Sequence, residues 1–426
     1  MADRFSSLLF RSSLAGCLLG FVAAVYRLAG LAGFAGVLGS NVCVAAAFAA
    51  AAVFFLYAFF AGLRQTDRLG RALGLAILAI IAIETLLSLA PPSARVTKAP
   101  IAYSYNPMLL DMLYAPWTLW NMQFVAKFVH ALFGYLTGLS LYAYLSRRMN
   151  AIYGLLGFLF FVSIPVVLRL SHWADVDLGV AFYSTATLLC LLRWREEKDS
   201  GSWLLLAALS AGFAAATQPN GLVAAGLSAF LFLITSLQEP RRGFARIAAE
   251  IALFAAAGAL ACLPWLAQNR LQAATSFFLP WAGFAGLETL TKGALFHGES
   301  WWRIAALPLR IFFIGRDDDP HNFAGVLSPL LLVFLPWAFK GKWLGEKRLL
   351  IGFTLLYFGH ALWVMELRAR YLLPVVPPLV ALAVYGVFNA YLSIKRPAYL
   401  FAGLIFFAAL HGLYLWRYFA GSVPLG

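Results

Sequence analysis

Residues 42–63 read VCVAAAFAAAAVFFLYAFFAGL, a run of 22 residues without a charge. A helix needs about 20 mostly apolar residues to cross the hydrocarbon core of a bilayer. Transmembrane β-strands are shorter and alternate apolar with polar residues, and this stretch does not alternate. The stretch therefore predicts a membrane-spanning helix.

The whole chain has the same character. Of its 426 residues, 62% are hydrophobic and only 12% are charged, which is more apolar than a soluble domain can bury. In lipid only helices and closed barrels satisfy the backbone, and long apolar runs indicate helices. We predict an all-α, polytopic membrane protein with about thirteen transmembrane helices. The predicted spans cover residues 12–36, 42–63, 72–91, 123–145, 152–168, 176–192, 202–217, 220–237, 247–266, 323–339, 349–365, 372–392 and 399–416.

The basic residues indicate how the chain is oriented. With these spans, the basic clusters fall at every second turn, all on one side: RQTDRLGR, SRRM, RWREEK, EPRRGFAR, FKGKWLGEKR and IKRP. Cytoplasmic loops carry the excess of Lys and Arg, so the pattern predicts a cytoplasmic N-terminus and an external C-terminus. The net charge of +14 is mainly this orientation signal, and it predicts no nucleic-acid partner.

Two predicted external segments, residues 92–122 and 267–322, are longer than connectors need to be. Both are rich in Trp, Phe and Leu, so we expect helices lying in the outer interface. The chain is accordingly divided into an N-terminal transmembrane hairpin (1–71), a core with the first external loop (72–246), and a C-terminal transmembrane region with the second external loop (247–426).

Acidic residues near the external face are the first candidates for chemistry. Asp111 is in the first external segment, and Asp175 and Asp177 precede the sixth span in RLSHWADVDLG. Two carboxylates beside the imidazole of His172 could share a proton or a metal ion. The alternative is structural, because an Asp at a helix start caps free backbone amides. Both interpretations stay open at this point.

Cationic residues on the external side are the second group, because they run against the orientation rule. Arg270, Arg368 and Arg370 suit phosphate recognition, since a guanidinium donates two parallel hydrogen bonds. The alternative is binding of lipid headgroups. Glu84 lies inside the third predicted span, where a carboxylate needs a partner. Lys127 or Arg27 could be that partner, and Glu84 would then belong either to a structural ion pair or to the site.

Several motifs in order resemble a known family. YNPMLLDMLYAPWTLW, WADVDLGVAFYSTATLLCLLRW, TQPNGLV, PWLAQNRL and ELRARYLLPVVPPL follow one another from the first external loop towards the C-terminus. The pattern resembles the GT-C glycosyltransferases, namely the polyprenyl- and dolichyl-phosphate-sugar-dependent enzymes such as protein O-mannosyltransferases and aminoarabinose transferases. The resemblance runs from about residue 72 onward, so the first two spans would be an added hairpin.

The resemblance implies a reaction and a location. Such enzymes take a sugar from a polyprenyl phosphate on the external face of the cytoplasmic membrane and pass it to a lipid, glycan or protein acceptor. An external Asp acts as general base, which implies Asp111, Asp175 or Asp177 here, with His172 nearby. Cationic groups hold the phosphate, which implies Arg270, Arg368, Arg370 and Lys127. No cofactor is implied with certainty, although the carboxylates could hold a divalent metal ion.

The chain departs from the family in its first loop. Family members usually carry an acid soon after the first core span, and here no Asp, Glu or His precedes Asp111. Either Asp111 takes the role of base, or Asp175 and Asp177 supply it, or the activity is lost. Asp177 matches the family pattern more closely than Asp111.

Two other functions would also explain these features. A carrier or flippase for a lipid-linked sugar needs external arginines but no base, and it would release no free polyprenyl phosphate. A catalytically inactive partner in envelope-glycan assembly would tolerate the loss of all three aspartates.

Overall fold

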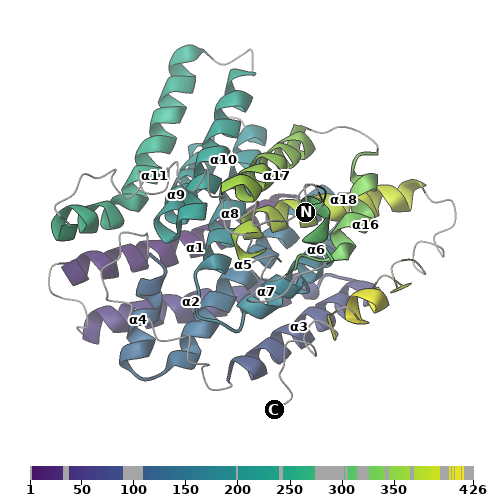
Figure 1. Ribbon diagram of the computed structural model, residues 1–426, viewed down its shortest axis with the longest axis horizontal. Coiled ribbons are helices and arrows are strands. Elements are labelled where there is room, and N and C mark those ends of the chain that lie inside the picture. The colour runs from purple at the N-terminus through teal and green to yellow at the C-terminus, as the bar shows by residue number, and fades with distance from the viewer. Residues whose placement is uncertain are drawn as a thin grey trace. The chain divides into compact units, whose positions relative to one another are not determined.

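A computed structural model describes residues 2–31, 38–89, 109–197, 200–238, 243–273, 302, 306–313, 326–340, 345–364, 369–393, 403, 405–406, 408–413 and 415–416 (Figure 1). The regular structure of these residues is helical, without a strand. The predicted all-α fold class is confirmed.

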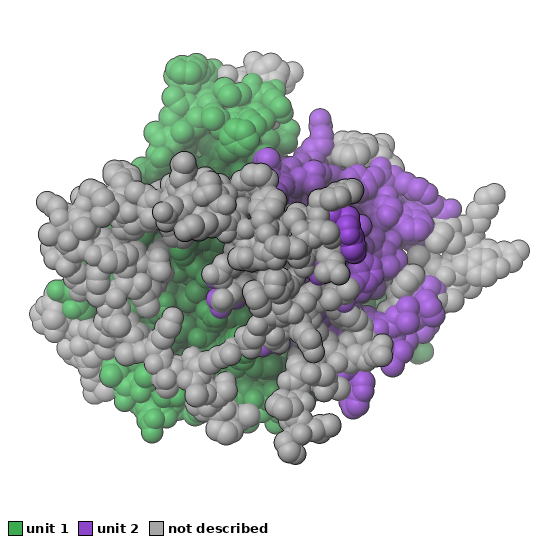
Figure 2. All heavy atoms as spheres, in the orientation of Figure 1, with its two compact units in different colours: residues 1–162, 170–287 green, residues 163–169, 288–426 purple. Residues whose placement is uncertain are grey.

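The chain forms two compact units, coloured separately in Figure 2. Unit 1 comprises residues 1–162 and 170–287, and unit 2 comprises residues 163–169 and 288–426. The predicted division at residues 71 and 246 stays a prediction.

The helices of unit 1 follow the predicted spans closely. They are α1 (Ala2–Leu31), α2 (Leu38–Leu63), α3 (Arg68–Ser88), α4 (Asp111–Leu119), α5 (Gln123–Arg148), α6 (Ala151–Val162), α8 (Asp177–Glu196), α9 (Gly201–Thr217), α10 (Pro219–Leu237) and α11 (Phe244–Ala273). α4 lies in the first external segment, where interfacial helices were expected, and its side chains from Met112 to Trp117 are buried.

Seven helices in the described residues are long and apolar enough to cross a membrane: α1, α2, α3, α5, α10, α11 and the segment Ala369–Ser393. A multi-pass membrane protein is therefore confirmed, and the total of thirteen spans stays a prediction. The span predicted at 152–168 is not one continuous helix, because α6 ends at Val162 and α7 (Pro165–Leu170) begins at a proline. Proline has no N–H to continue the hydrogen-bond ladder, and its ring clashes with the preceding turn.

The core of unit 1 is built around α5 and α8. Of the apolar window of α5, 89% is buried, against 22% for α3, so α5 is central and α3 is peripheral. α8 packs on α5 and α9, and α9 packs on α11. α1 and α2 run side by side (Figure 1), and both pack on α5. Both α2 and α3 expose several large apolar side chains, such as Tyr57 and Leu75, as expected for helices facing lipid.

Close helix packing in unit 1 depends on glycine. A Cβ added to Gly212 of α9 would lie 2.3 Å from the backbone oxygen of Gly258 of α11. Any side chain at this position would force α9 and α11 apart, so glycine allows the two backbones to touch.

Unit 2 contains α15 (Leu307–Arg310), α16 (Pro329–Ala338), α17 (Gly345–Val364), the 3-10 helix η3 (Ala369–Val375) and α18 (Val376–Ser393). α18 packs on α16 and α17. His411 has a hydrogen-bonded packing role, because its Nδ1 lies 3.2 Å from the hydroxyl of Ser328 and its Nε2 lies 3.0 Å from the carbonyl oxygen of Ser163.

Candidate active site

Three of the predicted carboxylates gather around one buried tyrosine in unit 1. Tyr114, on α4, is 5% exposed, and its hydroxyl donates a hydrogen bond to the backbone oxygen of Asp175. Burial raises the pKa of Tyr114 well above its usual value, and the charges of Asp111, Asp175 and Asp177 raise it further. The structure thus brings together acids that are 64 to 66 residues apart in the sequence.

The three carboxylates differ in how accessible they are. Asp177, in the first turn of α8, is fully buried at 0% exposure, whereas Asp111 and Asp175 are partly exposed. A general base must reach the acceptor hydroxyl directly or through one water. Accessibility therefore favours Asp111 and Asp175, although the sequence pattern favoured Asp177.

Asp175 also fulfils part of the structural alternative. One of its carboxylate oxygens accepts a hydrogen bond from the backbone N–H of Val176 at 2.9 Å. Val176 is the N-cap residue of α8, and its side chain makes no capping hydrogen bond. Asp175 therefore orders the chain just before the helix.

His130, on α5, fixes the position of residues 171–176, called here the acid loop, which contains Asp175 and leads into α8 at Asp177. Its Nε2 accepts a hydrogen bond from the N–H of Leu178 at 3.0 Å, one of the free amides at the start of α8. Its Nδ1 must then carry the proton and donate to the carbonyl oxygens of Trp173 (2.7 Å) and Leu170 (3.0 Å). His130 thus has a hydrogen-bonded packing role.

A cation that the sequence pattern did not single out as a phosphate ligand lies beside Asp111. Arg27, on α1, donates from Nε to Oε1 of Gln268 at 2.6 Å and contacts the sulfur of Met112 at 3.6 Å. Asp111 is near enough to act on Arg27 electrostatically. Gln268 is 3% exposed, and its Nε2 has no hydrogen-bond acceptor in the described residues. An amide donor and a guanidinium therefore lie together beside a carboxylate.

A second polar group surrounds the end of α3. Lys127 donates from Nζ to the backbone oxygen of Ser88 at 3.2 Å, and Nδ1 of His172 lies 3.5 Å from the hydroxyl of Ser88. Burial and the nearby charge of Lys127 lower the pKa of His172 to about 4. His172 is therefore neutral at pH 7.

Glu84 has a different partner from those the sequence suggested. Its Oε2 accepts a hydrogen bond from the hydroxyl of Tyr135 at 2.5 Å. Tyr135 lies two turns along α5 from Lys127, so the same helix supplies both groups. The structure places Lys127 beside His172 and the end of α3, and its predicted contact with phosphate stays a prediction.

The predicted phosphate-binding arginines are only partly described. Arg270 lies in α11, two residues beyond Gln268, and its side chain is not described. Arg368 lies outside the described residues. Arg370 belongs to unit 2, where its guanidinium donates to the hydroxyl of Tyr371 at 3.2 Å and lies over that ring. The roles predicted for these three arginines stay predictions.

A metal site is not apparent in the described part of the chain. Among those residues, no group of three or more His, Cys, Asp or Glu could hold a metal ion. Most of both long external segments, including Asp317, Asp318 and Asp319, lies outside this search.

Comparison with protein families gives one match. Residues 96–268 match the family described as dolichyl-phosphate-mannose-protein mannosyltransferase. This match confirms the resemblance to GT-C glycosyltransferases and supports a membrane glycosyltransferase of the mannosyltransferase type. It spans α4, α5, α8 and most of α11, and so includes Asp111, Asp175 and Asp177. No curated protein matches the chain.

Proposed function

We propose that the chain transfers a sugar from a polyprenyl-phosphate donor to a hydroxyl of a lipid, glycan or protein acceptor, on the external face of the cytoplasmic membrane. The observation that carries the proposal is the convergence of Asp111, Asp175 and Asp177 on Tyr114, inside the segment that matches the family.

Asp111 is the proposed general base. Its carboxylate takes the proton of the acceptor hydroxyl while that oxygen forms a bond to the anomeric carbon, and the bond from the anomeric carbon to the phosphate oxygen breaks with its electron pair. Arg27 and the amide of Gln268 offset the charge that develops on the leaving phosphate. Asp175 in the acid loop and Asp177 in the first turn of α8 lie near the same tyrosine.

An apolar cavity next to these groups would suit the isoprenoid chain of the donor. It has a volume of about 700 Å³ and lies between α9, α10 and α11. α10 and α11 each pack on α9 more extensively than on each other. One end of the cavity is lined by Leu266, two residues before Gln268, and by Ala215. The carbonyl of the next residue, Ala216, accepts a hydrogen bond from the N–H of Leu109 at 3.0 Å, just before α4.

The test measures transfer of label from a radiolabelled polyprenyl-phosphate sugar by the full chain in membranes. Asp111→Asn should lower the rate by about 10² to 10⁴, the usual contribution of a general base. Asp67→Asn is the matched control. The carboxylate of Asp67 accepts a hydrogen bond from the N–H of Gly70 at the start of α3, and Asp67 does not belong to the site. Free polyprenyl phosphate should appear in step with the transferred sugar.

The outcomes separate the alternatives. If Asp111→Asn keeps full activity and Asp175→Asn abolishes it, the enzyme class stands and the assignment of the base is wrong. If labelled donor crosses the membrane and no polyprenyl phosphate is released, the chain is a carrier. If all three aspartates can be replaced without a change in cell phenotype, the chain is an inactive partner.

A further inference from the structure

A polar pocket lies between the start of α1 and the end of α2, away from the end of α1 that carries Arg27. It has a volume of about 210 Å³, and Tyr142 of α5 is among the residues that line it. None of the twelve residues that line it is acidic. Its polar side chains are those of Arg4, Ser7, Arg11, Tyr57, Gln65 and Tyr142.

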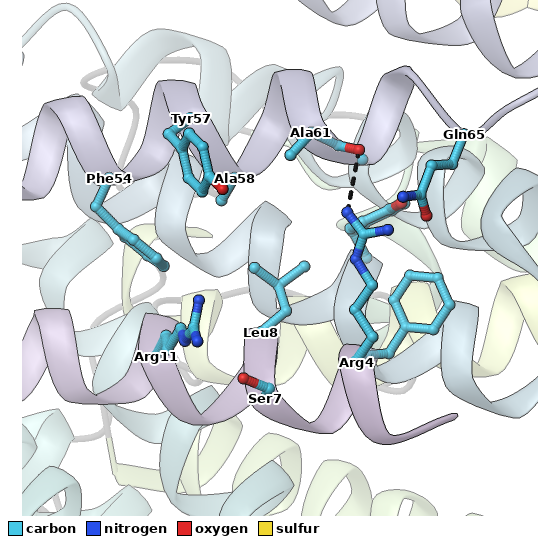
Figure 3. Close-up of a pocket in the computed structure, with 12 residues that line it drawn as sticks. Arg4, Ser7, Leu8, Arg11, Phe54, Tyr57, Ala58, Ala61 and Gln65 are labelled. Carbon is cyan, nitrogen blue, oxygen red and sulfur yellow. Dashed lines mark hydrogen bonds between the residues drawn. The ribbon is translucent and has the colours of Figure 1, made fainter. Parts of the chain in front are cut away.

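Two arginines give the pocket its charge. Arg4 and Arg11 are seven residues apart on α1, so they share one helix face about 10 Å apart. Figure 3 shows both side chains extending from α1 towards α2, on either side of Leu8. Arg4 donates one hydrogen bond, to the backbone oxygen of Ala61 at 3.3 Å, and has further N–H donors to offer. In the described part of the chain, Arg11 makes no hydrogen bond or ion pair.

The placement of both arginines in one pocket is not explained by the orientation of the chain in the membrane. Positive charge near a helix end is enough to keep that end in the cytoplasm, and exposed Arg64 in the turn after α2 already provides it. Orientation does not require two guanidiniums in one cavity. Both are exposed and lie near the N-terminal end of a candidate transmembrane helix of 28 residues, where a lipid headgroup can reach them.

We propose that this pocket binds a phosphate group, supplied by the headgroup of an anionic phospholipid in the adjacent leaflet. Basic pockets between transmembrane helices on the cytoplasmic side take such headgroups. Each planar guanidinium, of Arg4 and of Arg11, can donate two parallel hydrogen bonds to two oxygens of a phosphate. Phe54, Leu8 and Ala58 line the same cavity and give the apolar part of the lipid a surface to contact. The site does not depend on the proposed transferase activity.

The experiment uses the purified full chain and native mass spectrometry. The probes are phosphatidylglycerol and phosphatidylcholine with identical acyl chains. Arg11→Gln should weaken the first phosphatidylglycerol site about fivefold, and the double variant Arg4→Gln/Arg11→Gln about thirtyfold, with phosphatidylcholine unaffected. Arg64→Gln removes the same charge from the same end of unit 1 but does not line the pocket, so it should bind as the wild type does.

Each result has a definite meaning. Excess inorganic phosphate that displaces the lipid from the wild type would assign the pocket to a soluble phosphate, whereas a lipid that stays bound confirms the headgroup. Equal loss in Arg11→Gln and Arg64→Gln, or wild-type binding with no preference for phosphatidylglycerol, would overturn the proposal. Arg11 makes no polar contact with the described residues, so the Arg11→Gln variant should fold. It therefore tests the proposal even if the double variant is unstable.

Discussion

Replacement of His130 is predicted to damage the site without touching a carboxylate. The imidazole joins α5 to both sides of the acid loop, because it accepts from Leu178 at 3.0 Å and donates to Trp173 at 2.7 Å. It is 0% exposed, so water cannot replace the lost partners. His130→Ala leaves a helix-start amide and two carbonyl oxygens unsatisfied in the interior.

The size of the effect follows from these contacts. A buried donor or acceptor that loses its partner costs about 1–3 kcal/mol. If the hydrogen bonds to Trp173 and Leu178 are each counted at about 2 kcal/mol, His130→Ala should lower the free energy of unfolding by about 4 kcal/mol. The cavity left by the ring adds to this cost.

Two conservative variants divide the effect between the two sides of the ring. The amide of Asn can take the place of Nδ1 and donate to the carbonyl of Trp173, but it does not reach Leu178. The carbonyl of Gln can take the place of Nε2 and accept from Leu178. We expect His130→Asn and His130→Gln each to recover about half of the lost stability. If the position of the acid loop matters for transfer, both should lower the turnover rate and leave donor KM nearly unchanged.

The assay combines thermal unfolding, the transfer assay and ¹⁵N NMR of histidine. His360→Ala is the matched control, because His360 is half-buried in α17 and makes no hydrogen bond among the described residues. The NMR signal of His130 should be that of the Nδ1–H tautomer. The reasoning fails if His130→Ala lowers the unfolding temperature no more than His360→Ala does, or if His130 carries its proton on Nε2.

Three further predictions concern the same unit. Because burial lowers the pKa of His172 from about 6.5 to about 4, its contribution to folding stability should be complete above pH 6.5, should fall by up to about 3 kcal/mol between pH 6.5 and 4, and should not change further below that. His172→Gln should flatten this part of a plot of unfolding temperature against pH. Gly212→Ala should destabilise the protein by about 1–3 kcal/mol, because its Cβ would meet backbone at 2.3 Å, whereas Gly226→Ala, with open space around it, should not; thermal unfolding of the pair decides. Tyr114→Phe removes the donor to the Asp175 carbonyl, so it should cost about 1–3 kcal/mol and lower transfer, and an unchanged unfolding temperature would contradict that.

The sequence predicts the helices of unit 1 well, because apolar length alone decides them. The span predicted at 220–237 is observed as Pro219–Leu237, and the one at 202–217 as Gly201–Thr217. The break after Val162 was not predicted, although Pro165 was visible, because proline is often tolerated in transmembrane helices.

The candidate site could be predicted only in part. An Asp in an external segment is conspicuous, so Asp111, Asp175 and Asp177 could be found from residue type and predicted location. The role of Tyr114 could not be found in this way, because it depends on a contact between α4 and a loop 61 residues later. Periodicity places a residue on a face of its own helix but does not say which distant loop that face meets.

The N-terminal hairpin was predicted as an addition to the core, yet α1 is connected to the core by polar contacts within apolar surroundings. The hydroxyl of Ser12 lies 3.1 Å from that of Ser140 on α5, and the hydroxyl of Tyr183 on α8 donates to the carbonyl of Gly16 at 2.9 Å. A polar group that loses its partner inside a membrane protein has no water to replace it. Removal of α1 would therefore expose unsatisfied groups on α5 and α8. It would also remove Arg27, which lies beside Asp111 although it precedes the matched segment, residues 96–268. A chain that lacks α1 and α2 should thus lose the proposed phosphate contact as well as stability, and adding the two helices back as a separate peptide should restore transfer, whereas the same peptide with Arg27→Gln should not.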